Sequence, residues 1–410
     1  MSTAEAFSQP AGNQQRRAAL MVLFLTVFID LLGFGIVIPF LPLYAEQMHV
    51  SAAGIGLILS AYSLAQFLVA PILGRLSDHF GRRPIIMLGL LGSAVSYVIY
   101  GFASSFAWLL LSRAAHGACA GTISTAQAYV ADTTDERGRA HGMGMIGAAF
   151  GLGFVLGPGI GGLLGHANMR TPVFFAAALT FANLIFAALR LPESHRPEPS
   201  ARLALAHLFE PFARMPARLA DGSLAALFAL AFLGTFAMSA FEATFAMMAP
   251  AVYGYGPAGV GGLLAYAGLI QAIVQGYLIG KLAPRVGEMR LIRWGLAIFA
   301  IGLAPLASAG SHAALYALLA LVAIGYGFAS PAIASLISKR AARHLQGEVL
   351  GVNQSALSLA RIFGPLAGGV VYGAVGPTAA YVGAAVAAAL ALALTRASVS
   401  TPAPASASSP

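Results

Sequence analysis

Long apolar runs dominate this chain and constrain its fold more than any other feature. Twelve stretches each hold about 20 mostly apolar residues, the length that a helix needs to cross a bilayer. Only 9% of the 410 residues are charged, against about a quarter in a soluble domain. We therefore expect an all-α polytopic membrane protein with twelve transmembrane helices. The predicted spans are 20–43, 55–75, 84–102, 106–131, 142–165, 172–191, 223–249, 258–282, 290–309, 313–338, 347–374 and 377–396.

The basic residues predict the topology. The chain has 23 Lys+Arg, and 20 of them flank the spans on one side. The opposite side has Arg170, and two more, Arg113 and Arg361, lie inside spans. Loops with an excess of Lys and Arg are typically cytoplasmic, so both termini are expected in the cytoplasm. The net charge of +9 then reflects topology, and we expect no nucleic-acid partner. The first span is expected to be its own insertion signal.

The longest polar stretch divides the spans into two groups of six. It covers 192–222 and contains five prolines, which is typical of a linker. The Ala/Ser/Pro-rich end of the chain predicts a disordered tail. The predicted parts are a cytoplasmic N-terminal segment 1–19, an N-terminal six-helix bundle 20–191, a cytoplasmic linker 192–222, a C-terminal six-helix bundle 223–396 and a cytoplasmic tail 397–410.

The two groups also repeat each other. The segment 74–81 recurs at 280–287, an offset of 206 residues. The string Gly157-Pro158 with Gly162 recurs at 364–369, an offset of 207 at its start. Parallel six-helix repeats build two-domain transporters, whose substrate site lies between the halves near the middle of the membrane.

Four charged side chains are expected inside the membrane: Asp30, Arg113, Glu242 and Arg361. A charge there is costly, so each is a functional candidate. We expect Asp30 to pair with Arg113 and Glu242 with Arg361, and all four to take part in proton coupling. Static ion pairs that fix helix packing remain an alternative.

Two motifs have unusual spacing. The loop after span two holds Gly74, Asp78, Gly81, Arg82 and Arg83. Its glycines permit tight turns, and Asp78 is placed to cap a helix N-terminus, where the helix dipole favours an anion.

The second motif lies in span five, where a proline that kinks the helix is surrounded by small residues that allow close helix contact. Its members are Gly153, Gly157, Pro158, Gly161 and Gly162.

These motifs resemble those of the major facilitator superfamily, specifically the twelve-span drug:proton antiporter family in its tetracycline and multidrug exporter branch. The resemblance covers about residues 20–396. Residues 74–83 match the loop signature of this family, and 153–162 match its antiporter signature. Residues 111–117 match its span-four pattern, with Arg113 at the position of the pattern's arginine. The string 29–42 resembles span one of this branch, acid included.

The resemblance implies roles for single residues. Asp78 would latch the halves by contacting the start of span eleven, and the loop would act as a gate. Arg113 would couple protons beside Asp30, itself a proton or substrate site. Residues 153–162 would set the bend of span five.

The chain also departs from the family. His79 replaces a preferred arginine, His116 replaces a glutamine, and Pro284 replaces the aspartate in the second copy of the loop. Tetracycline exporters of this branch carry further acids in spans three and nine and a histidine in span eight. Those spans lack them here, where Gln271 and Gln275 occupy span eight, which argues against tetracycline as substrate.

The central helices are expected to line a substrate cavity with adaptable side chains, a set that can equally serve helix packing. The cavity candidates are Gln66, Gln127, Phe241, Phe245, Gln271, Gln275 and Asn353, with Tyr129, Phe236, Met238, Glu242, Met247, Met248 and Tyr326 as further members.

Together these features predict a proton-coupled secondary transporter that exports small amphiphilic compounds by alternating access. It is expected to work as a monomer in a bacterial inner membrane, with no cofactor and no metal. Alternatives are a symporter that imports a metabolite, an exporter of an endogenous metabolite, and a receptor or scaffold that does not transport. A membrane enzyme would need a clustered catalytic set, which the sequence lacks.

Overall fold

The computed structural model describes residues 13–134, 136–166, 168–194, 222–341 and 346–397. The described residues fold as helices without strands. Their bounds are α1 Asn13–Val37, α2 Phe40–Gln47, α3 Ala52–Phe80, α4 Arg82–Gly101, α5 Phe106–Cys119, α6 Thr122–Thr133, α7 Glu136–Gly165, α8 Thr171–Arg190, α11 Gly222–Tyr253, α12 Pro257–Ile273, the π-helix η2 Val274–Leu278, α13 Ile279–Val286, α14 Glu288–Leu303, the short 3₁₀ turn η3 Leu306–Ser308, α15 His312–Arg340, α16 Gln346–Val375 and α17 Pro377–Ala397.

Eleven of the predicted spans appear as helices, or runs of abutting helices, that are long and apolar enough to cross a membrane within the described residues. The twelfth, predicted over 106–131, is divided into α5 and α6 at Ala120 and Gly121. At this break the Gln66 side chain donates a hydrogen bond of 3.3 Å to the Ala120 carbonyl. The Gln66 amide therefore satisfies a carbonyl that an intact helix would have bonded internally.

Two other spans are less regular than the sequence predicted. Span one continues beyond Pro39 into α2, and span eight contains the π-helix Val274–Leu278. π-helical turns are rare and often occur at functional sites. The predicted linker 192–222 lies outside the described residues except for 192–194 and residue 222, and the predicted tail does so from residue 398 onward.

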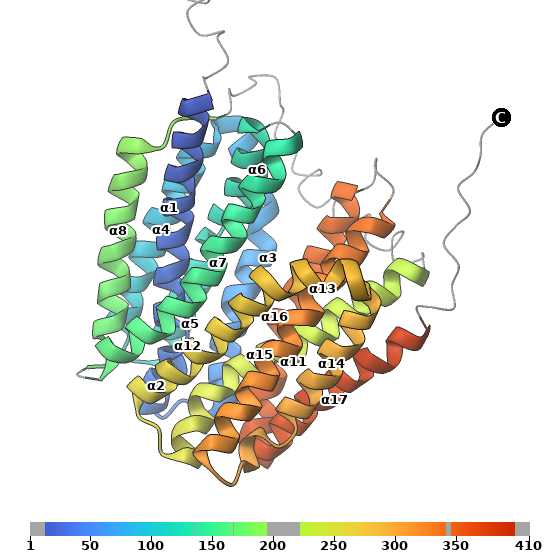
Figure 1. The fold of residues 1–410 in the computed structure, drawn as a ribbon. Helices are drawn as coiled ribbons and strands as arrows, with labels where there is room; N and C mark the ends of the chain where they lie inside the picture. Colours follow the sequence, from blue (N-terminus) through green and yellow to red (C-terminus); the bar gives the residue numbers. More distant parts are fainter. Residues whose placement is uncertain (1–12, 135, 167, 195–221, 342–345, 398–410) are drawn as a thin grey trace, which may run out of the picture.

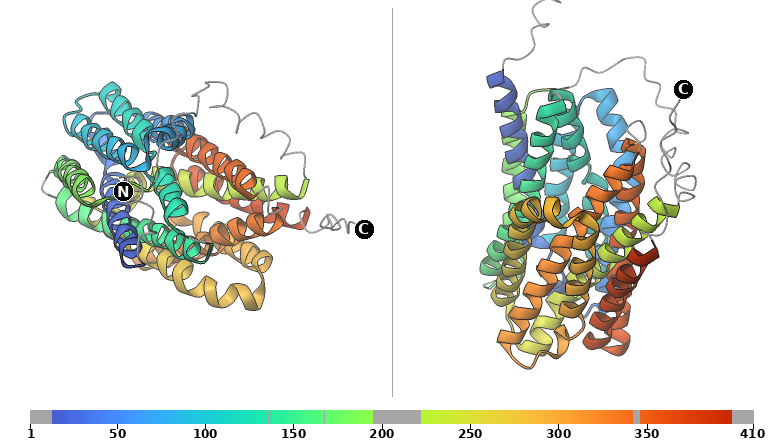
Figure 2. Two further views of the ribbon diagram at one scale, coloured as in Figure 1. Left: turned by 90° about the horizontal axis from the view of Figure 1, so that it is seen from above. Right: turned by 45° about the vertical axis from the view of Figure 1, so that its right-hand side comes forward.

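The helices form two bundles side by side, α1–α8 and α11–α17 (Figures 1 and 2). We call them the N half and the C half. In the N half α1 packs against α7 and α8, and in the C half α11 packs against α16 and α17. Apolar cores lie around Tyr97 and Leu90 in the N half and around Phe241 and Leu296 in the C half. The core around Tyr97 also contains Met247 of α11.

We name the two ends of the molecule by their charge. The basic end is where α1 begins and α3 and α17 end, and it carries most of the described Lys and Arg residues. The far end is where α2 and the α7–α8 turn lie, with Arg170. Figure 1 shows the basic end at the top of the N half.

The halves touch along two helix pairs, α3 with α16 and α7 with α12. The contacts lie toward the far end. Ser60 Oγ donates a 2.5 Å hydrogen bond to the Ile362 carbonyl, and a methyl group added to Gly56 would collide with the Pro365 carbonyl. We call this closed contact region the seam.

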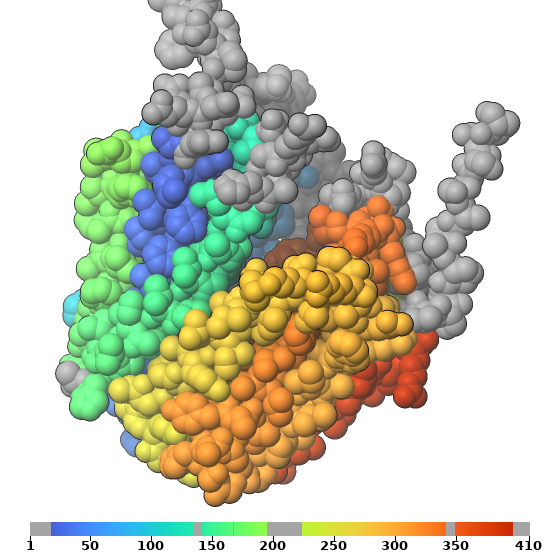
Figure 3. Space-filling view, viewed as in Figure 1, coloured from blue at the N-terminus to red at the C-terminus, as the bar shows by residue number. Residues whose placement is uncertain are grey.

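Toward the basic end the same helices separate. A methyl group added to Gly74 of α3, Gly147 of α7, Gly276 of η2 or Gly351 of α16 would meet no atom within 4 Å. Figure 3 shows the surface hollowed between the halves on this side. The structure is therefore closed at the far end and open at the basic end.

Candidate substrate and proton site

The four intramembrane charges lie where the opening meets the seam. Arg361 stands at the middle of α16, one residue before Ile362, whose carbonyl accepts the Ser60 hydrogen bond. The charges of Asp30, Arg113 and Arg361 all act on the hydroxyl of Tyr62 in α3. Residues from both halves thus converge around Tyr62.

Arg113 does not pair with Asp30 in this conformation. The arginine is 2% exposed, and its Nη1 lies 3.1 Å from His116 Nδ1. Because a guanidinium can only donate, His116 Nδ1 accepts, and this places the ring proton on Nε2. The guanidinium also lies over the rings of Tyr62 and Phe34, 4.7 and 5.7 Å from their centroids. Its buried Nε has no hydrogen-bond partner among the described residues.

Glu242 and Arg361 also lie close together without forming an ion pair. The charge of Arg361 acts on the Glu242 carboxyl, and both side chains are exposed although each lies well inside a long helix. None of the four charged residues is ion-paired with another described residue. The structure brings the predicted residues into one region but forms neither predicted pair.

An aromatic wall, absent from the sequence prediction, lines the N-half side of this region. Phe34 lies 5.1 Å from Tyr62 and 6.0 Å from Phe154. The His116 ring lies 5.1 Å from Tyr62 and 4.6 Å from Tyr97. The available sequence signal was a tyrosine in the apolar run of α3, one helical turn before Gln66. The wall offers ring faces beside charged groups, a combination suited to amphiphilic and cationic ligands.

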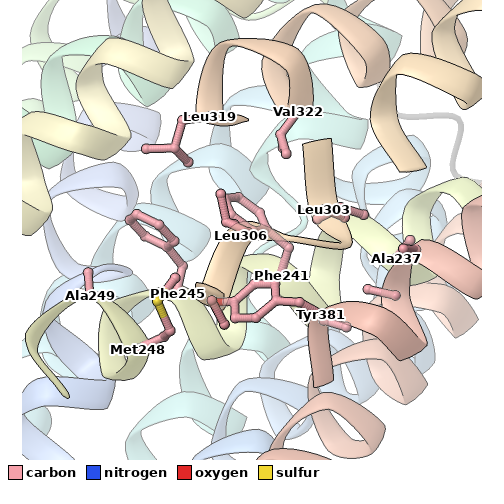
Figure 4. Packing of buried hydrophobic residues seen from close by; sticks show 14 of the residues in the cluster. Ala237, Phe241, Phe245, Met248, Ala249, Leu303, Leu306, Leu319, Val322 and Tyr381 are labelled. Atoms are coloured by element: carbon pink, nitrogen blue, oxygen red, sulfur yellow. The ribbon is translucent and has the colours of Figure 1, made fainter. Parts of the chain in front are cut away.

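Phe241 and Phe245 do not line the opening, which corrects the prediction. They are 1% and 0% exposed and pack at 5.2 Å from each other in the closed core of the C half, together with Met248 and Tyr381 (Figure 4). Residues 241, 245 and 248 share one face of α11 because helical neighbours recur every three to four residues, and exposed Glu242 lies off that face. The predicted members Tyr129, Met247 and Met248 are likewise buried at 0–2% exposure.

The predicted amides have four different surroundings. Gln66 is bonded at the α5–α6 break, and Gln127 is exposed on α6. Gln275 is exposed in η2, one turn after half-buried Gln271. Asn353 is buried, and its Oδ1 has no hydrogen-bond partner within the described part of the chain. It lines a cavity of about 40 Å³ in the C half with Thr235, Tyr326 and Ser330.

The antiporter motif of α7 presents two faces. One face packs on α1: a methyl group on Gly157 would lie 2.5 Å from the Gly35 carbonyl carbon, and one on Gly161 would lie 2.5 Å from the Ile36 oxygen. Gly153 lies on the same face, against Leu31. The other face packs across the seam, where a methyl group on Gly162 would lie 3.2 Å from Ala258 of α12. Pro158 belongs to this second face.

The repeat in α16 has the same two faces. A methyl group on Gly364 would lie 2.7 Å from the Phe236 carbonyl of α11, within the C half. One on Gly369 would collide with the Ala52 carbonyl of α3, across the seam. The two motif copies therefore supply one helix to each of the two helix pairs of the seam. Each copy packs on its own half with one face and across the seam with the other.

The predicted gating loop is tied together by Arg82. This residue donates to Asp132 of α6 at 2.8 Å and pairs with Asp78 at 2.5 Å. Gly81 has φ +99° and its repeat Gly287 has φ +85°, a region that favours glycine, which explains why both copies keep this residue. Asp78 pairs with Arg82, and its predicted contact with the start of span eleven falls on residues outside the described side chains, so it stays a prediction.

Two members of this network were missed by the sequence prediction. The Glu193 carboxylate accepts hydrogen bonds from the backbone N–H groups of Arg82 and Arg83, at 2.9 and 3.1 Å. It thus caps α4 from the start of the linker, and Asp132 closes the loop from α6. Both are acids beside the predicted spans, and only the fold brings them to the loop.

Comparison with known proteins agrees with this architecture. The chain is 34% identical over 366 residues to the class C tetracycline resistance protein of Escherichia coli, covering 88% of this chain and 91% of that protein. It is 29% identical to multidrug resistance protein 2 of Bacillus subtilis, covering 87% and 90%. A solved bacterial homolog of the human lysosomal transporter Spinster shares the fold at a TM-score of 0.78 and 17% identity, covering 96% of this chain and 98% of that one. The Major Facilitator Superfamily matches residues 23–365 and 276–410, and the chain is therefore a member of that superfamily.

Proposed function

We propose that this protein exports small amphiphilic compounds from the cytoplasm in exchange for protons. Relatives named for multidrug and tetracycline resistance support export. Bacterial relatives support an inner-membrane location, and the positive-inside rule supports an orientation in which the basic end and both termini face the cytoplasm. The opening then faces the compartment from which an exporter takes its substrate.

The observation that carries the proposal is the set of unpaired charges at the floor of the opening. Asp30 and Arg113 both act on the Tyr62 hydroxyl, and Arg361 acts on the Glu242 carboxyl. Among the described residues none of the four forms an ion pair. An ionised carboxylate inside a membrane is costly unless a cation compensates it. The Asp30 carboxylate can therefore either bind a proton or form an ion pair with an arginine. A change between these two states links proton binding to conformation.

The seam supplies the moving part. Apart from the Ser60–Ile362 hydrogen bond, its described contacts are close approaches at glycines, which can part without breaking ion pairs. The halves 20–191 and 223–396, joined by the linker 192–222, would rock about the floor of the opening. The gating loop would then close the basic end as the seam opens. The cycle requires a single chain, and we propose that the monomer is the working unit.

Proteoliposomes with an acidic lumen and a trapped pH probe test this function. Addition of a substrate is expected to discharge the gradient with the native protein and not with Asp30→Asn. Glu46→Gln is the matched control, because Glu46 is an exposed acid at the far end. The panel contains a lipophilic cation, a neutral amphiphile and tetracycline. Acidification of a neutral lumen on substrate addition would instead establish symport, and unimpaired discharge by Asp30→Asn would remove Asp30 from the coupling.

A further inference from the structure

A pair of arginines lies outside the opening, on the outer face of the C half at the basic end. Here α14 and α17 pack together and leave between them a hollow of about 430 Å³. Arg293 at its rim comes from the second turn of α14, and Arg396 comes from the last turn of α17. The hollow is lined by Arg293, Ala389, Leu392, Ala393, Thr395 and Arg396.

Arg293 is held in a fixed orientation at this hollow. Its Nε donates to Thr395 Oγ1 at 3.1 Å, and its Nη2 donates to the Thr395 carbonyl at 3.2 Å. Thr395 itself is 1% exposed, so the anchor is rigid. A guanidinium has five N–H donors in a planar fork, and these two bonds leave donors for a ligand. Arg396 adds a second, exposed cation.

No described carboxylate neutralises the two arginines. Neither forms an ion pair with a described residue. Glu288, at the start of α14, is engaged instead by Lys339 and Ser335. The N half differs, because there Arg82 is paired with Asp78 and Asp132.

The same two helices also expose large apolar side chains, which we call the apolar wall. Trp294 and Ile301 of α14 are 50% and 62% exposed, and Val386 and Leu390 of α17 are 51% and 54% exposed. Such a face is covered by acyl chains in a membrane. Tryptophan is enriched at the level of lipid headgroups, and Trp294 directly follows Arg293.

We propose that this hollow binds the headgroup of an anionic phospholipid from the leaflet at the basic end. The phosphodiester accepts hydrogen bonds from Arg293 and Arg396, and the acyl chains lie along the wall of α14 and α17. Arg forks match phosphate oxygens in charge and geometry. A zwitterionic lipid also brings an ammonium group, which finds two guanidiniums and no acid among the described residues here. The site therefore selects net negative lipids, and it is independent of the transport cycle.

Native mass spectrometry of the full chain in detergent tests the site, with phosphatidylglycerol and phosphatidylethanolamine titrated separately. The native protein is expected to retain phosphatidylglycerol in preference to phosphatidylethanolamine. The double variant Arg293→Gln/Arg396→Gln is expected to weaken phosphatidylglycerol binding by about tenfold or more, since each basic residue near the surface contributes attraction. Excess inorganic phosphate is expected not to displace the lipid.

The matched control is Arg285→Gln/Arg340→Gln, which removes two exposed charges from the same end and is expected to leave the affinity within about twofold, because only the general surface attraction changes. An equal loss in both double variants would reduce the effect to general surface charge. Equal retention of the two lipids would refute anionic selection, and displacement by inorganic phosphate would make the hollow a free phosphate site. If the double variant does not fold, Arg396→Gln alone decides, because it leaves the Arg293–Thr395 bonds intact.

Discussion

Ser60 Oγ and the Ile362 carbonyl are joined by a hydrogen bond of 2.5 Å, which links α3 to α16 immediately beside Arg361. The seam and the charged site thus share a backbone segment. A motion that opens the seam must move the segment that carries Arg361. This relationship makes the seam a place where the transport cycle can be tested.

Gly56→Leu is expected to hold the far end open. Any side chain at this position meets the Pro365 backbone, which cannot move as a rotamer can. A reporter Ala52→Cys, in a Cys119→Ala background, is expected to react several-fold faster with a polar maleimide when Gly56→Leu is present, because a parted seam exposes it. Gly383→Leu on α17 is the control, since position 383 has open space and lies outside the seam and the gating loop. Unchanged reporter reactivity would mean that the seam does not form as described.

The two faces of the antiporter motif are expected to respond differently to bulk. Gly157→Leu overpacks the contact with Gly35 inside the N half and is expected to lower the free energy of unfolding by about 1–3 kcal/mol. Gly162→Leu meets α12 across the seam, so it is expected to preserve the melting temperature and abolish transport. Gly151→Leu is the control at a position with open space. Thermal unfolding and transport assays on all three check this, and equal melting temperatures for the first two contradict it.

Arg82→Ala is expected to destabilise the N half more than a surface charge would. Arg82 is 7% exposed, and its removal leaves Asp132 without its cation, a change that costs about 3–5 kcal/mol in buried pairs. Asp78→Ala is expected to cost less, because the Asp78 side chain is 58% exposed. Thermal unfolding of the two single variants and of Arg82→Ala/Asp132→Ala forms a cycle. The double variant should recover part of the loss.

His116→Leu is expected to impair coupling whereas His116→Gln preserves it. Leucine removes the acceptor of the Arg113 hydrogen bond, and a charge-assisted bond of this kind contributes about 1.5–3 kcal/mol. Glutamine can still accept from the guanidinium. Substrate-driven proton flux is the readout, with an expected loss of about tenfold or more for leucine. Equal flux in both variants would show that His116 only fills space.

Phe241→Ala is expected to act on stability and not on substrate choice. The ring is 1% exposed and packs against Phe245 and Tyr381. Truncation of a buried phenylalanine costs about 3–5 kcal/mol. Melting temperature and the relative transport of several substrates separate the two roles, and Phe34→Ala provides the comparison in the aromatic wall. A changed substrate order with an unchanged melting temperature would place Phe241 at the opening after all.

The sequence by itself determined the membrane class, the twelve spans, the repeat and the charged residues of the site. These follow from local information. A bilayer demands long apolar helices, and a charged residue within such a helix is recognisable whatever the direction of its side chain. Glycine at 81 and 287 was equally readable as a turn requirement. The tertiary structure decided which face of each helix meets which neighbour. That information placed Phe241 and Phe245 in a closed core and assembled Phe34, Tyr62 and Phe154 into a wall. It also left Asp30 and Arg113 without an ion pair among the described residues. In a chain with apolar residues on every face of its helices, periodicity does not distinguish lipid, core and cavity, so only the packing could.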